Sequence, residues 1–221
     1  DIRLSLVGSE MCIRDSHERV IKFAKEFVGD KTDVLSKVLN LYYAVRDEIR
    51  YDPYLPVAKV ESYRASDAVI TGKGWCVPKS ALLAACCRIN KIPARPGYAD
   101  VKNHLATDRL LDLLGTDLFA WHSYCEIYID GNWVKATPAF NASLCEKFGL
   151  KPLEFDGRND SLFHEFDKAG NKHMEYIEDR GTYFDVPFDK IIDTFKEIYK
   201  PGYINGCLLY TSDAADEGLG V

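Results

Sequence analysis

Hydrophobic positions recur every three or four residues in two early segments of the chain, which is the spacing of one face of an α-helix. Residues 18–28 carry such a stripe and stop at Gly29, and a stronger stripe begins after Asp33 and reaches Ile49. An aspartate directly before an apolar stripe is typical of a helix N-cap, because its carboxylate accepts a backbone N–H. The pattern predicts two amphipathic helices, followed by a proline-interrupted, non-helical stretch at 51–56.

The strongest apolar pattern lies in the middle of the chain. We expect a short helix around 66–70 and a loop at 71–74, after which an almost continuous apolar run extends from Cys76 to Asn90. A helical run without a polar face indicates burial on all sides. Pro78 suits its first turn, where the missing N–H costs nothing. The sequence therefore predicts a buried helix with Cys76 at its N-terminus.

Aromatic and β-branched residues become frequent after this helix, which favours strands. We expect an extended segment at 92–98, a helix at 103–114, strands at 119–129 and 132–137, and a last amphipathic helix at 186–199. Asp130-Gly131 between the two strands predicts a tight hairpin, since both central residues of such a turn need positive φ. Helices first and antiparallel strands later predict an α+β fold.

Size, composition and charge narrow the class of protein. The chain has 221 residues, is 47% hydrophobic and carries a net charge of -6. These values suit one globular domain and argue against a nucleic-acid binder, which needs a basic face. No apolar run approaches the ~20 residues that span a bilayer. Seven irregularly spaced cysteines without a C-x-x-C pair argue against a zinc site, so we expect reduced thiols, a cytoplasmic location, and neither metal nor cofactor.

The two ends of the chain look foreign to the rest. Residues 1–16 and 207–221 resemble translated sequencing-adapter read-through, almost verbatim over SLVGSEMCIRDS and LLYTSDAADE. Both ends are therefore set aside for fold prediction, as an expression scar would be. We expect artefactual tails at 1–16 and 207–221 around a single domain at 17–206.

Cys76 and His122 are the residues best suited to covalent chemistry. Backbone N–H groups at a helix N-terminus favour a thiolate and can stabilise an oxyanion on a substrate carbonyl. Strand alternation places His122 on one face with Tyr124, Glu126 and Tyr128. In the expected hairpin register Thr137 lies diagonally from His122, within side-chain reach. Cys76, His122 and Thr137 are thus candidate nucleophile, base and orienting partner.

Several segments closely resemble the transglutaminase-like superfamily over roughly residues 40–141. The resemblance rests on GWC at Cys76, on IPAR at 92–95 after Arg88, on WH at His122, and on GNW at 131–133. The upstream stretch 49–52 is similar to the strand that precedes the catalytic loop in that family. The resemblance implies a papain-like core, in which a buried helix beginning at the catalytic cysteine packs on an antiparallel β-sheet.

One position departs from the family pattern. The family supplies an aspartate before a proline as the third triad member, whereas here Thr137 precedes Pro138. A threonine hydroxyl can orient an imidazole but cannot stabilise imidazolium by charge. Three readings stay open: a Cys–His–Thr site, a dyad oriented by Asn141 or Asp156, and a decayed site.

The resemblance implies a cysteine enzyme that attacks amide carbonyls of a peptide or protein substrate through a thioester, with hydrolysis favoured over transamidation. Trp75, Tyr51 and Trp121 would line the cleft, and the indole of Trp75 could serve the oxyanion. A non-catalytic peptide- or partner-binding module of the same fold is the alternative. An arylamine N-acyltransferase-like enzyme is a weaker one, because no basic phosphate-binding loop for acyl-coenzyme A occurs.

Overall fold

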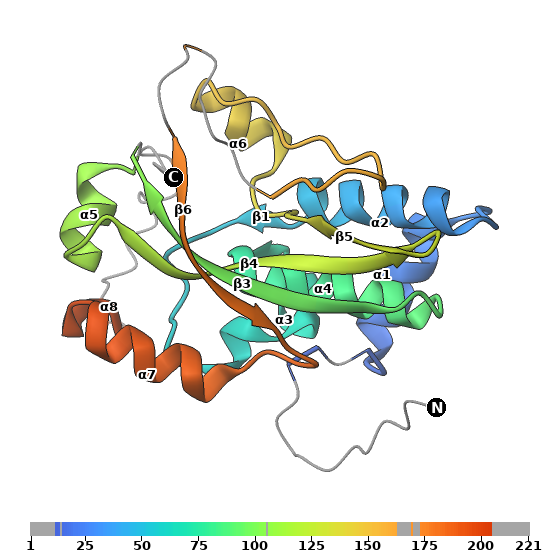
Figure 1. Cartoon of the computed structure of the whole chain (residues 1–221). Coiled ribbons are helices and arrows are strands. Elements are labelled where there is room, and N and C mark those ends of the chain that lie inside the picture. The colour runs from blue at the N-terminus through green and yellow to red at the C-terminus, as the bar shows by residue number, and fades with distance from the viewer. Residues whose placement is uncertain (1–11, 14, 105, 163–168, 170–172, 205–221) are drawn as a thin grey trace.

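The protein was analysed as a computed structural model that describes residues 12, 13, 15–104, 106–162, 169 and 173–204 (Figure 1). Helices α1 (Glu18–Val28) and α2 (Val34–Glu48) form where the hydrophobic stripes predict them. The Asp33 carboxylate accepts the Ser36 backbone N–H at 2.8 Å, which confirms the predicted N-cap. Both helices turn their apolar faces inward, and Val38 and Val45 of α2 are fully buried.

Helix α4 (Cys76–Ile89) is the centre of the molecule. Every residue from Cys76 to Cys87 is buried, as the uninterrupted apolar run predicts. It packs against α1, α2, α3 (Ala65–Thr71) and the 3₁₀ turn η1 (Val60–Tyr63) on some sides, and against two sheet strands on another. A helix surrounded in this way holds the side chain at its N-terminus in a fixed place.

A four-stranded antiparallel sheet covers one side of α4. Its order is β5-β4-β3-β6, with β3 (Ala94–Asn103), β4 (Leu118–Ile129), β5 (Asn132–Ala136) and β6 (Met174–Thr182). The predicted two-residue hairpin is present: Ile129 pairs with Asn132, and Asp130 and Gly131 have φ of 48° and 91°. The α+β class and the helix-on-antiparallel-sheet core are therefore confirmed.

Other segments differ from the expectations. Strand β3 continues to Asn103, so the predicted helix at 103–114 shortens to α5 (Asp108–Leu114). The expected loop at 71–74 contains β2 (Lys73–Gly74), which pairs in parallel with β1 (Arg50–Tyr51). Helix α6 (Ala142–Lys147) and strand β6 have no strong hydrophobic period, and the sequence did not predict them. Helix α7 (Phe188–Ile198) confirms the last amphipathic segment, and α8 (Pro201–Ile204) follows it.

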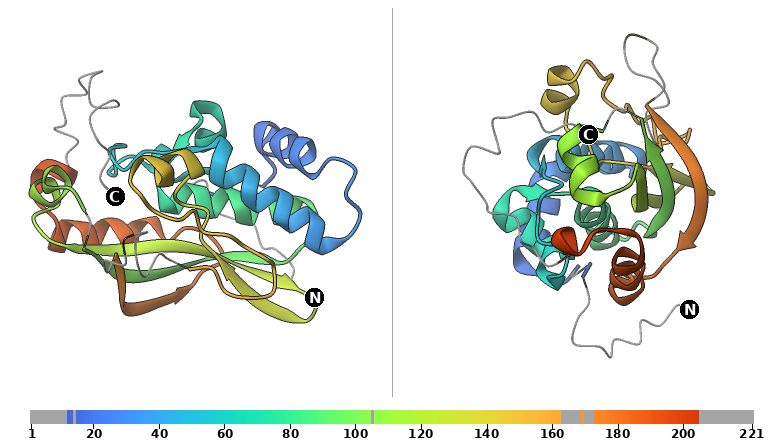
Figure 2. Two further views of the ribbon diagram at one scale, coloured as in Figure 1. Left: turned by 90° about the horizontal axis from the view of Figure 1, so that it is seen from above. Right: turned by 90° about the vertical axis from the view of Figure 1, so that its left-hand side faces the viewer.

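The elements form two layers with a cap at one end. Figure 2 shows α1, α2, α3 and α4 lying over one face of the curled sheet, while α5, α7 and α8 gather at one end of it. Among the described residues no helix combines the length and apolarity that a bilayer crossing requires. Of the two predicted tails, residues 1–11, 14 and 207–221 lie outside the described part, whereas Cys12 and Ile13 are buried in the core.

Candidate active site

The Cys76 side chain lies at the first turn of α4, where backbone N–H groups have no helical partner. Trp75 is the N-cap and makes no side-chain capping bond. The backbone N–H groups of Ser123, Val77 and Cys76 instead lie within hydrogen-bonding reach of the sulfur. Three N–H dipoles around one sulfur form a place where negative charge can develop during a reaction.

Cys76 and His122 line the same small pocket, of about 40 Å³. His122 comes from β4, across the sheet–helix interface from the start of α4, and 8% of its surface is exposed. The other lining residues are mostly apolar or aromatic. They come from β1 and the loop after it, the N-cap of α4, α5, β4, α7 with its C-cap, and α8: Tyr51, Pro53, Trp75, Leu110, Leu114, Phe119, Ala120, Phe195, Tyr199 and Tyr203. The structure thus brings together the two residues that the sequence singled out, 46 positions apart.

The resting charge of Cys76 differs from the sequence-based expectation. Burial raises the pKa of the Cys76 thiol to about 12, although the N–H groups of Ser123, Val77 and Cys76 itself lower it. Only 5% of the residue is exposed, so desolvation of the anion outweighs the helix terminus. In this closed arrangement the thiol is therefore neutral at physiological pH, and a base is needed to take its proton.

Two of the predicted cleft residues, Tyr51 and Trp75, line the Cys76 pocket. The indole N–H of Trp75 donates to the Ser62 carbonyl at 3.1 Å, so this N–H is committed to η1 and is not directed at an oxyanion. The Trp75 ring packs edge-on against Tyr63. Trp75 and Tyr51 are thus walls of the pocket, which corrects the idea that Trp75 supplies an oxyanion donor.

Trp121 does not line the Cys76 pocket, contrary to the expectation. Its side chain borders a separate open groove of about 420 Å³ with Arg180 and Tyr183, and the Arg180 guanidinium lies 5.0 Å from the ring centroid. Trp121 stands between Ala120 and His122, which both line the Cys76 pocket, and neighbouring residues of a strand point to opposite faces. Its φ of 60°, in the left-handed region, also marks a bulge at this point. A bulge of this kind could not be read from the sequence alone.

Thr137 occupies the place that the hairpin register predicts. The last β4–β5 pair is Cys125 with Ala136, so Thr137 follows immediately, on the strand neighbouring His122. Thr137 is 2% exposed, its N–H donates to the Ser161 carbonyl at 2.8 Å, and its carbonyl accepts from the Tyr42 hydroxyl at 3.2 Å. Its own hydroxyl makes no hydrogen bond with a described residue, so an orienting role for Thr137 stays a prediction.

The two alternative orienting residues are engaged elsewhere. Asn141 accepts the Tyr51 backbone N–H through Oδ1 at 3.1 Å and donates to the Ser143 hydroxyl through Nδ2 at 2.7 Å. Asp156 lies in an exposed loop, where its carboxylate accepts the backbone N–H groups of Arg158 and Asn159 at 2.8 Å. Asn141 therefore fixes the backbone of a pocket wall, and Asp156 shapes its own loop.

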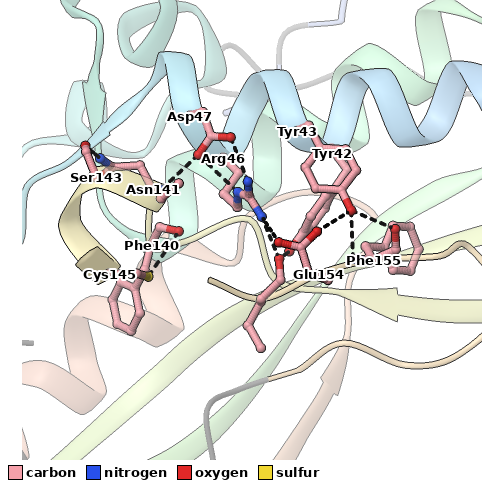
Figure 3. A network of polar contacts seen from close by, with 12 residues as sticks. Tyr42, Tyr43, Arg46, Asp47, Phe140, Asn141, Ser143, Cys145, Glu154 and Phe155 are labelled. Atoms are coloured by element: carbon pink, nitrogen blue, oxygen red, sulfur yellow. Dashed lines mark hydrogen bonds and ion pairs between the residues drawn. The ribbon is translucent and has the colours of Figure 1, made fainter. Parts of the chain in front are cut away.

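The sequence analysis did not predict a polar network that connects the wall of the Cys76 pocket to helix α2. Figure 3 shows Arg46 and Asp47 of α2 reaching toward the segments on either side of α6. Arg46 donates to Asp47 and, through Nη1, to the Leu153 carbonyl at 2.9 Å, while Asp47 accepts the Ala142 backbone N–H at 2.9 Å. The network ties Asn141, and through it Tyr51, to α2. Its members are scattered polar residues without a motif, so no sequence signal pointed to them.

Lys79 is the second feature that the sequence did not reveal. It lies one turn after Cys76 in α4 and is fully buried. Its ammonium donates to the carbonyls of Arg46, at 2.9 Å, and of Ile49, at the end of α2, where the last carbonyls of a helix lack helical partners. Lys79 thereby fastens the first turns of α4 to α2. Among the described residues no three His, Cys, Asp or Glu side chains are grouped to hold a metal ion.

Comparison with known proteins adds a family. A sequence profile of the transglutaminase-like superfamily matches residues 21–138, which is more than half of the chain. A search of curated protein sequences gave no match.

Solved structures show more distant similarity. A "Putative Cysteine Protease" from Cytophaga hutchinsonii is 26% identical, with a TM-score of 0.42 over 60% of this chain and 39% of that chain. A TGase is 15% identical, with a TM-score of 0.44 over 100% of this chain and 54% of the other. An arylamine N-acetyltransferase from Mycobacterium abscessus is 12% identical, with a TM-score of 0.47 over 90% and 76%. The chain thus spans only about two fifths of the Cytophaga protein.

Proposed function

Because the chain belongs to the transglutaminase-like superfamily, a superfamily of cysteine-based enzymes, we propose that it breaks amide bonds through a thioester on Cys76. The observation that carries the proposal is the shared pocket of Cys76 and His122. A thiol at a helix N-terminus beside an imidazole is the arrangement that nucleophilic catalysis needs. The substrate would be a peptide or protein amide.

The neutral resting thiol assigns His122 a general-base role in the proposed reaction. As the Cys76 sulfur attacks the carbonyl carbon, His122 takes the thiol proton, and N–H groups near the sulfur, such as that of Ser123, support the oxyanion. The C–N bond then breaks and His122 returns the proton to the leaving amine. Water, activated by His122, hydrolyses the thioester and restores the thiol. Thr137 would orient the ring from the neighbouring strand.

The lining of the pocket supports a small apolar acyl group in the substrate. Leu110 and Leu114 of α5, Phe119 of β4 and Phe195 of α7 line the pocket together with Cys76, and none of the described lining residues is Asp, Glu, Lys or Arg. A charged substrate group would lose its hydration there without a partner. The proposed substrate therefore carries an uncharged, compact side chain on the carbonyl that Cys76 attacks.

Turnover of a panel of short peptide amides by the parent and by Cys76→Ala and His122→Gln tests this proposal. We expect the parent to release amine, with a thioester at Cys76 detectable by mass spectrometry after acid quenching. Both variants should lose at least about 10³-fold in kcat/KM. Cys145→Ala, which removes a buried thiol outside the pocket, is the matched control and should retain turnover. Turnover that survives Cys76→Ala would rule the proposal out.

A non-catalytic peptide-binding module is the second candidate. Two observations favour it: threonine stands where the family has aspartate, and burial raises the pKa of Cys76 to about 12. Under this alternative the parent would show no turnover, and Cys76→Ala would bind a peptide as tightly as the parent does. Calorimetric titration of both proteins with the same peptide distinguishes the two functions.

A further inference from the structure

The backbone immediately before His122 is held in an unfavourable conformation. Trp121 has φ of 60°, a left-handed conformation that a residue with a side chain keeps only when its surroundings compensate for the strain. The register of β3 against β4 shifts at this point: Ala99 pairs with His122, but Val101 pairs with Phe119. Two residues of β4 therefore face one residue of β3, Asp100, which is a β-bulge.

The bulge sets how β4 arrives at His122. Ala120 and His122, on either side of Trp121, line the Cys76 pocket, whereas Trp121 itself borders the separate groove with Arg180. From His122 to Ile127 the pairing of β4 with β3 is uninterrupted, so the irregularity is confined to the residues between Phe119 and His122. A β-bulge re-aims the side chains next to it. The left-handed backbone of Trp121 therefore sets the direction in which His122 leaves the strand.

Asp100 holds the bulge from the neighbouring strand. It is 3% exposed, and Oδ1 accepts the Trp121 backbone N–H at 3.0 Å. Arg180 of β6 donates to both carboxylate oxygens, to Oδ2 at 2.6 Å, and its guanidinium also lies 5.0 Å from the centroid of the Trp121 ring. One buried carboxylate therefore fixes the Trp121 backbone, while its ion-pair partner fixes the Trp121 ring.

We propose that Asp100, supported by Arg180, is a positioning residue that keeps Trp121 left-handed and so directs His122 at Cys76. The inference rests on the proposed function for its catalytic consequence, but the placement of His122 can be measured without turnover. Asp100 touches no reacting atom. Its contribution is geometric, and a displacement of about 1 Å in a catalytic group can cost about 100-fold in rate.

The test combines the imidazole NMR signal of His122, assigned by its loss in His122→Gln, with peptide-amide turnover. Asp100→Ala should move the His122 signal and lower kcat about 100-fold with little change in KM. Asp100→Asn keeps an oxygen for the Trp121 N–H and should stay close to the parent in both. Glu126→Ala is the matched control, because it removes another strand carboxylate from its arginine without touching the bulge.

A second variant distinguishes positioning from general destabilisation. Glycine adopts positive φ without penalty, so in a Trp121→Gly background Asp100→Ala should shift the His122 signal much less than it does in the parent. An equal shift in both backgrounds, or an unmoved signal in Asp100→Ala, would overturn the proposal. If Asp100→Ala does not fold, Asp100→Asn with a displaced His122 signal would contradict it equally. Absence of turnover in the parent would refute the proposed function alone, since the signal reports His122 directly.

Discussion

At the scale of single residues, burial makes the charged forms of two groups in α4 less favourable than they are in water. Burial raises the pKa of Cys76 to about 12 and lowers the pKa of Lys79 well below its usual value. Both groups lie in the first two turns of α4. The start of this helix therefore depends on a thiol that keeps its proton and on an ammonium whose protons are held by backbone carbonyls.

Replacement of Lys79 by methionine tests the second of these residues. The carbonyls of Arg46 and Ile49 would lose their donor, so the free energy of unfolding should fall by about 1–3 kcal/mol. The loss should be larger at pH 9 than at pH 6, because a lowered folded-state pKa makes the parent gain stability as pH rises toward the unfolded pKa of about 10.4. Urea unfolding of both proteins at the two pH values measures it.

The surface variant Lys196→Met is the control for this experiment. Lys196 is exposed and pairs only weakly with Asp193, at 3.4 Å. It should change the unfolding free energy by less than about 0.5 kcal/mol at either pH. An equal loss for Lys79→Met at pH 6 and pH 9 would contradict the assigned direction of the pKa shift.

At the scale of elements, the pairing of β3 with β4 depends on one close approach. Gly97 faces Tyr124 across the ladder, and a Cβ built at Gly97 would lie 2.3 Å from the Tyr124 ring. Tyr124 is 2% exposed and cannot swing into solvent. The glycine thus lets an aromatic ring lie flat on the strand, two residues from the pair of Ala99 with His122.

Gly97→Ala should therefore lower the free energy of unfolding by about 1–3 kcal/mol through overpacking. Gly202→Ala is the matched control, since nothing lies within 4 Å of a Cβ built there and the position is helical. Thermal unfolding of the two variants and the parent measures the difference. A Gly97→Ala protein as stable as the parent would mean that the Tyr124 ring does not pack on β3 as described.

The same scale shows what sequence reasoning could predict. Helices α1, α2, α4 and α7 were predictable because each buries a stripe, or its whole surface, in an order that the residues display directly. The Asp130-Gly131 hairpin was predictable because its backbone needs particular residue types. Strand β6 was not, since most of its residues are exposed or half-buried and its pairing with β3 comes from a segment far away in the chain.

The candidate site likewise has some features that the sequence predicts and others that it does not. Cys76 and His122 lie within recognisable sequence motifs, and the strand register that places Thr137 follows from the geometry of the turn. The conformation of the Trp121 backbone and the position of its ring depend instead on Asp100 and Arg180, which are 21 and 59 positions away in the chain. The charge of the Cys76 thiol depends on its burial by elements that are distant in the chain, and no local sequence pattern reveals that burial.

At the scale of the whole molecule, buried acidic groups make stability sensitive to alkali. Burial raises the pKa of the thiols of Cys76, Cys86, Cys87 and Cys125, whereas unfolded cysteine ionises near pH 8.5. Above that pH the unfolded chain releases protons that the folded chain keeps. The slope of unfolding free energy against pH is therefore negative there.

The free energy of unfolding should fall by about 5 kcal/mol between pH 8 and pH 10 in reducing buffer. The four thiols together lower it by about 8 kcal/mol, and the lowered pKa of Lys79 returns about 2–3 kcal/mol over the same range. Urea titrations across this range measure it. In Cys87→Ala the free energy of unfolding should fall less steeply with pH, by the contribution of one thiol, whatever the stability of the variant at pH 7. A slope of zero or above would show that the thiols are not buried as described.

Helix α4 is packed on all sides, which limits the routes by which a substrate could reach the Cys76 sulfur. The helices α1, α2 and α3 and the strands β3 and β4 cannot part without dismantling the core. The rest of the boundary of the Cys76 pocket consists of the loop after β1 at Pro53, the short helices α5 and α8 of seven and four residues, and one end of α7. A substrate larger than this pocket would reach the sulfur only if these short segments moved, so we expect their motion to influence the rate of turnover.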